Sequence, residues 1–149
     1  MSYEERNTVA GLITSLIVLV YFGGRIWGTW ADGGFDGPDG LTLWARTVLW
    51  MIPACVVVTI VVTILFNIGH AIFTGTANPS FVTDERDAHI GKRAMQLSMV
   101  LISAGFLLAL GVLAIGASAL VVLNLILASF ALGAVASEVF KLAAYRFGL

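Results

Sequence analysis

Charged side chains are scarce in this sequence. Of its 149 residues only 11% are charged and 59% are hydrophobic, and the mean hydropathy is +0.97. Soluble domains carry about 25% charged residues, so the composition excludes an ordinary soluble globular fold. The formal net charge is −1, and nucleic-acid binding needs a clustered basic surface. We therefore expect no direct contact with nucleic acid.

Residue types that carry chemistry are also few. The single cysteine, Cys55, lies within an apolar run and cannot form an internal disulfide, so it does not indicate a redox compartment. The sequence contains no nucleophile elbow, no paired-histidine zinc motif and no phosphate-binding glycine loop. We expect a protein that is not an enzyme and that uses no cofactor.

Long apolar runs make up most of the sequence. Residues 94–137 contain no Asp, Glu, Lys, Arg or His. A membrane-spanning helix needs about 20 apolar residues, so this stretch holds two spans joined by the short turn at 116–118. Two earlier apolar runs complete four predicted spans, at about 8–30, 43–73, 94–115 and 119–140, in a single domain within the lipid bilayer. The first span follows an acidic segment with Glu4 and Glu5, unlike a signal peptide, so we expect it to be retained.

Short connections and the distribution of charge predict the topology. We expect an all-α four-helix bundle made of two antiparallel helical hairpins. One side of the predicted membrane has most of the Lys and Arg residues near span ends: Arg6, Arg86, Lys92, Arg93, Lys141 and Arg146. The other side has Arg25 and Arg46, and also Trp27, Trp30, Trp44 and Trp50. The positive-inside rule therefore places both termini and a charged linker at 74–93 in the cytoplasm, with an aromatic belt at the outer boundary.

Polar residues within the second span fall on one stripe. At 100° per residue its members lie within a sector of about 80°; they are Thr59, Thr63, Asn67, His70 and Thr74. One interpretation is hydrogen bonding to a neighbouring helix. The alternative is a water-accessible or ligand-lined seam that ends at His70.

Two faces are distinguishable on the fourth span. Ser129, Gly133 and Ser137 recur every four residues and predict close helix packing. The opposite face consists of Asn124, Ala128, Ala131, Val135 and Glu138. Two such faces predict contacts on both sides of the helix, within the bundle or between subunits. For Glu138, we expect pairing with Lys141, Lys92 or Arg93; a proton relay would need further ionisable groups.

Small-residue pairs also occur in the first span. Gly11 with Ser15 and Gly24 with Gly28 are each four residues apart, a spacing that lets two helix backbones approach closely. Such faces would allow the chain to form a homo-oligomer.

The densest charge lies between the second and third spans, at 83–93. A cytoplasmic protein could dock on its charged side chains, namely Asp84, Glu85, Arg86, Asp87, Lys92 and Arg93. Glu85 and His89 share a helix face and, with His70, could form a three-ligand metal site. The alternative is a helix start, in which Thr83 or Asp84 caps the helix and acidic residues occupy its first turn.

Three runs of residues resemble a family of small, uncharacterised four-span proteins of the bacterial inner membrane. They are MSYEERNT at 1–8, DERDAHI at 84–90 and VFKLAAYRFG at 139–148. Members tend to carry D-x-R-D-x-x-I after the second span and a V-x-Y-R-x-G-like end, although Val9 stands where members often have tryptophan. The genes of this family often neighbour a small helix-turn-helix regulator. The resemblance thus implies a bacterial inner-membrane location and a regulatory partner.

Together these features predict a non-enzymatic membrane protein that senses for, or sequesters, a cytoplasmic partner such as a helix-turn-helix regulator. Two alternatives remain. The chain could be an accessory or structural subunit of a larger membrane complex. It could also transport a small solute or a metal, although the third and fourth spans carry no series of buried ionisable groups for a proton relay.

Overall fold

Four long helices form the protein. The computed structural model describes residues 3–75 and 85–148, and this part contains no strand. The helices are α1 (Tyr3–Ala31), α2 (Gly40–Thr74), α3 (Glu85–Ala114) and α4 (Ala119–Phe147). The predicted all-α, four-helix class is therefore confirmed.

Each helix is longer than its apolar span. The helices contain 29 to 35 residues, and each is long and apolar enough to cross a membrane. The protein is thus a multi-pass membrane protein by the length and composition of its helices. The predicted linker at 74–93 is corrected, because α3 already begins at Glu85 and residues 85–93 are its first turns. The suggested caps Thr83 and Asp84 lie outside the described residues.

Helix ends follow from local sequence. In the turn between α3 and α4, Gly116 adopts a left-handed backbone with φ 92°, which glycine accommodates without steric cost. Ser118 then caps α4, since its hydroxyl accepts a hydrogen bond from the Val121 amide at 3.5 Å. Gly75 and Gly148 end α2 and α4 in the left-handed conformation typical of helix C-termini.

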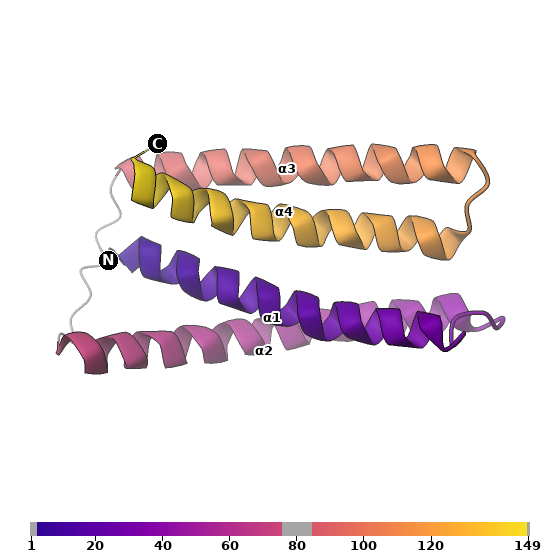
Figure 1. Ribbon diagram of the computed structural model, residues 1–149, viewed down its shortest axis with the longest axis horizontal. Coiled ribbons are helices and arrows are strands. Elements are labelled where there is room, and N and C mark those ends of the chain that lie inside the picture. The colour runs from indigo at the N-terminus through magenta and orange to yellow at the C-terminus, as the bar shows by residue number, and fades with distance from the viewer. Residues whose placement is uncertain (1–2, 76–84, 149) are drawn as a thin grey trace.

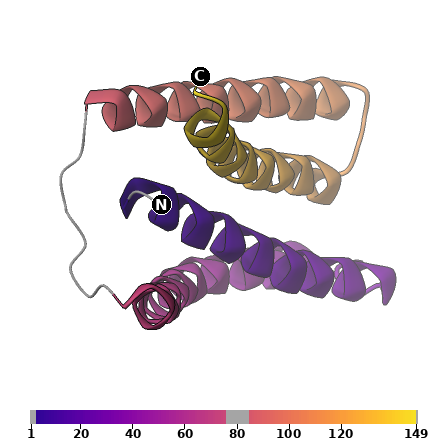
Figure 2. The ribbon, with the colours of Figure 1, turned by 60° about the vertical axis from the view of Figure 1, so that its left-hand side comes forward.

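The helices lie side by side in the order α2, α1, α4, α3 (Figure 1). Neighbours in this order pack against each other. The outer helices are α2 and α3, and Figure 2 shows the end of α2 well separated from the start of α3. Both termini lie at the same end. We call this the charged end, formed by the first turns of α1 and α3 and the last turns of α2 and α4. The opposite end contains Trp27, Trp30, Trp44 and Trp50, and we call it the tryptophan end.

Small residues let α3 and α4 approach closely. A Cβ atom on Gly105 of α3 would overlap the Ser129 side chain, and one on Gly133 of α4 would lie 2.9 Å from Ser98 Oγ. Ala94 and Ala109 of α3 are fully buried beside this contact. The close-packing role predicted for Ser129 and Gly133 is therefore confirmed.

A small core closes the tryptophan end. Ile26, Phe35 and Trp44 are buried together, with leucines of α4 packed against them. Trp44 also reaches α4, because its indole Nε1 donates to Asn124 Oδ1 at 2.9 Å. Phe35 belongs to the connection between α1 and α2, where it is surrounded in the sequence by glycine and aspartate. Its burial anchors that connection to the helices.

Candidate functional site

The charged end brings together two of the sequence runs singled out above. At the start of α3, Arg86 Nη2 donates to the backbone carbonyl of Ala144 near the end of α4, at 3.3 Å. One residue further along each helix, the Tyr145 hydroxyl hydrogen bonds the Asp87 carboxylate. The runs 84–90 and 139–148 are therefore joined by direct contacts, although 58 positions separate Arg86 from Ala144 in the sequence.

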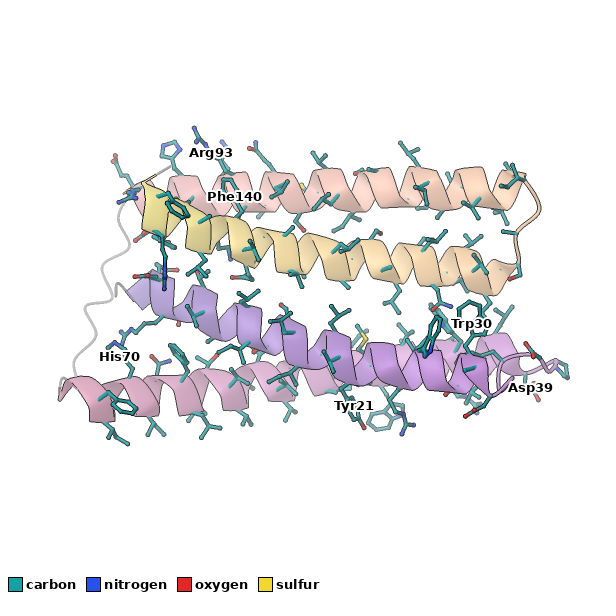
Figure 3. The ribbon with its side chains drawn as sticks, viewed as in Figure 1. Tyr21, Trp30, Asp39, His70, Arg93 and Phe140 are labelled. Carbon is teal, nitrogen blue, oxygen red and sulfur yellow. The ribbon has the colours of Figure 1, made fainter. Side chains whose placement is uncertain are left out.

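A second contact joins α1 to α2. Arg6 is 8% exposed, and its Nη1 lies 3.2 Å from Nδ1 of His70. A guanidinium only donates hydrogen bonds, so Nδ1 of His70 acts as the acceptor in this contact. His70 points from α2 toward α1 in Figure 3. Its position therefore fixes the end of α2 against the start of α1.

A third contact lies on the inner pair of helices. Lys141 Nζ donates to Glu138 Oε1 at 2.8 Å, both on α4. The Glu138 carboxylate also lies against α1, because a Cβ on Gly11 would be 3.2 Å from its Cδ and Oε2. The expected pairing of Glu138 with Lys141 is confirmed. This ion pair lies at the interface between α1 and α4. Because Gly11 has no side chain, the Glu138 carboxylate can approach α1 at this position.

Other charged side chains face outward. On the first turns of α3 the exposed side chains that carry a charge or an imidazole are Glu85, Arg86, His89, Lys92 and Arg93. Figure 3 shows Arg93 pointing away from α4. Asp87 is half-buried against Tyr145, and Asp84 lies outside the described residues. Of the predicted docking residues, Glu85, Lys92 and Arg93 are exposed. Arg86 and Asp87 also hold α3 to α4.

The suggested metal site is not assembled. His70 contacts Arg6 on α1, whereas Glu85 and His89 lie on α3, the outer helix on the other side of the protein. Among the described residues, no group of three His, Cys, Asp or Glu side chains is arranged to hold a metal ion. The physical reason is the helix order, in which α1 and α4 lie between α2 and α3.

The polar side chains of the α2 stripe make contacts of two kinds, within α2 and to α1. Thr59 Oγ1 donates to the carbonyl of Cys55 at 2.7 Å, and Asn67 Nδ2 donates to that of Thr63 at 2.8 Å. Both bonds stay within α2, so they do not join it to another helix. Of the stripe, His70 makes the contact to a neighbouring helix that the structure records. The side chain of Thr74 lies outside the described part.

Three pairs described above could not be inferred from local sequence: Trp44 with Asn124, Arg6 with His70, and Asp87 with Tyr145. Each joins two helices whose register follows from packing. The available signal was the presence of isolated polar residues in apolar surroundings, which need partners.

No protein-family model matches the chain, and no curated protein or solved structure matches it either.

Proposed function

We propose that this chain is a non-enzymatic membrane protein whose charged end docks a cytoplasmic protein. The observation that supports this most directly is the surface of the first turns of α3. There Glu85, His89, Lys92 and Arg93 are exposed and carry both signs of charge. Mixed charges of this kind favour selective encounter with a complementary protein surface.

The partner follows from the resemblance noted above. In the proposal, the chain is a bacterial inner-membrane protein with both termini in the cytoplasm, and its partner is a helix-turn-helix regulator encoded beside it. Binding at the charged end would hold that regulator at the membrane, away from DNA. The lysine and arginine count at the two ends supports this orientation.

The test compares two double charge reversals with the same change in net charge. Lys92→Glu with Arg93→Glu alters the exposed surface of α3, and Arg25→Glu with Arg46→Glu alters exposed residues at the tryptophan end. We expect the first pair to abolish co-purification of the neighbouring regulator and the second to leave it unchanged. Equal capture by both variants, or no capture by the unaltered protein, would contradict the proposal.

Reversal of Arg86 and Asp87 is a less selective probe. Arg86 donates to the Ala144 carbonyl and Asp87 is bonded to Tyr145, so their reversal would also loosen α3 from α4. A reporter fused to the C-terminus should be included for each variant, because altered charge near span ends can invert topology. A reporter signal from outside the cytoplasm in the unaltered protein would reject the orientation.

A second candidate function is an accessory subunit of a larger membrane complex. It is favoured by the outer helices, since 0% of the apolar stretch of α2 and 6% of that of α3 is buried, against 17% for α1 and α4. Purification in a mild detergent separates the candidates. Other membrane chains in fixed proportion would support a complex, whereas a homo-oligomer alone would count against it.

A further inference from the structure

A long groove lies between α1, α2 and α4. Its volume is about 550 Å³, within the range of about 300–1,000 Å³ typical of small-molecule sites. Along α1 it extends from Thr14 to Trp30, which corresponds to about 24 Å at the helical rise. Met51 and Cys55 of α2 and residues 124–134 of α4 contribute the other walls. The groove therefore follows the direction in which lipid chains lie in a membrane.

Several side chains that line the groove carry hydrogen-bond donors, among them Ser15, Trp27, Trp30 and Asn124, and a contact to α2 defines the orientation of Asn124. Asn124 lines it near the tryptophan end and accepts from Trp44 Nε1 through Oδ1. Because an indole N–H only donates, this bond determines which way the amide is turned. The two N–H groups of Nδ2 have no acceptor among residues 3–75 and 85–148. Donors without partners in an apolar environment are costly, so an occupant with an acceptor would be stabilised.

The absence of charged side chains from the described lining of the groove favours a neutral acceptor for the Asn124 donors. None of the described residues lining the groove is charged, so a carboxylate there would lose its hydration without gaining a counter-ion. A neutral carbonyl fits the Asn124 donors. The depth agrees as well, because Trp27 and Trp30 line the same end of the groove, and tryptophans of membrane proteins gather at the headgroup level. In Figure 3, Trp30 points from α1 toward α4.

We propose that the groove binds one acyl chain of a phospholipid from the leaflet at the tryptophan end, with Asn124 donating to the ester carbonyl of that chain. A phospholipid has its ester carbonyls just below the headgroup and its apolar chain directly beneath. The groove presents its donor and its apolar walls in the same order. This lipid site is independent of the docking surface at the charged end.

The test uses purified, delipidated protein reconstituted with palmitoyl-oleoyl phosphatidylethanolamine and then analysed by native mass spectrometry in mild detergent. The unaltered protein should retain one phospholipid. Ala131→Phe, which fills the groove, should lose it. Asn124→Leu should retain about tenfold less, the factor expected when one hydrogen bond is removed.

Two control variants separate lipid binding from a loss of structure. Ala104→Phe adds the same ring to an exposed position of α3 outside the groove. Trp44→Phe breaks the bond to Asn124 but leaves its amide in place. Ala104→Phe should retain the phospholipid as the unaltered protein does, and Trp44→Phe, which frees the amide to turn but keeps its donors, should retain more than Asn124→Leu.

Three results would overturn the proposal. The first is equal retention by all variants, which would indicate non-selective lipid. The second is loss from Trp44→Phe as large as that from Asn124→Leu, because Asn124 would then act through Trp44. The third is a different tightly held occupant of the unaltered protein as isolated from cells, such as a free fatty acid or a prenyl quinone.

Discussion

The two helix pairs of this protein are held together in different ways. Between α3 and α4, small residues bring the backbones close, and the turn at Gly116 is short. Between α1 and α2, large side chains fill the space at the tryptophan end, and Arg6 with His70 joins the charged end. The stretch between these contacts includes the groove of about 550 Å³. The α3–α4 pair has close backbone contacts at Gly105 and Gly133, whereas the α1–α2 pair is joined mainly near its ends.

This difference shows that small residues have no single role in a membrane helix. Gly105 and Gly133 each face an atom of the neighbouring helix, but around Gly24 of α1 a Cβ would meet nothing within 4 Å among the described residues. In lipid, helices associate through van der Waals packing and hydrogen bonds because the bilayer is as apolar as the side chains. Close packing therefore stabilises α3 against α4, whereas α1 depends more on individual polar contacts.

The largest expected effect comes from forcing α3 and α4 apart. Gly105→Leu would place its side chain into Ser129, and we expect it to lower the free energy of unfolding by about 3 kcal/mol, at the upper end of overpacking penalties. Gly111→Leu on the same helix is the matched control, because a Cβ there has no described atom within 4 Å. Unfolding in a denaturing detergent would measure both. Similar stability of the two variants would show that close approach does not hold this pair.

A smaller effect is expected at the contact between α1 and α4. Lys141→Met would leave the Glu138 carboxylate, whose side chain is 18% exposed, without its 2.8 Å partner. We expect a loss of about 1–2 kcal/mol, since hydrogen bonds to charged groups are stronger than neutral ones. Adding Glu138→Gln should recover part of that loss. Lys92→Met, at an exposed lysine of the same end, should leave the unfolding free energy within about 0.5 kcal/mol of the unaltered protein.

The bond between Trp44 and Asn124 should contribute less. Interhelical hydrogen bonds in membranes average about 0.6 kcal/mol in double-mutant cycles and reach about 1.7. A cycle with Trp44→Phe and Asn124→Leu should give a coupling energy in that range, because the Nε1–Oδ1 distance is 2.9 Å. Strictly additive losses would mean that the two side chains do not interact.

The smallest effect is expected at Gly24, which is exposed on α1. Gly24→Leu should change the unfolding free energy of the monomer by less than about 0.5 kcal/mol. If Gly24 and Gly28 form a homo-oligomer interface, the same variant should instead shift the oligomer toward monomer in light scattering. Such a shift would show that the small residues of α1 mediate contacts between chains, whereas those of α3 and α4 mediate contacts within one chain.

Much of the architecture could be predicted from the sequence. The apolar run at 94–137 and the turn at 116–118 predicted a pair of spans, and Ser129 with Gly133 predicted the close contact. The metal site was not predictable in this way. Glu85 and His89 do share a helix face, but His70 belongs to α2, on the far side of α1 and α4. Phe35 was also missed, because glycine and aspartate around it dominate the composition of its loop.

Four helices, their approximate bounds and the separation of charged residues from tryptophans all follow from the order of residues along the chain. These properties depend on local composition, since apolar length and turn residues act within a few positions of the chain. The inner position of α1 and α4 and the groove beside Asn124 depend instead on how the helices pack. Helix order and register depend on how side chains far apart in the sequence fit together. That fit arises only when the helices pack, and several arrangements of the same four spans satisfy the same local pattern.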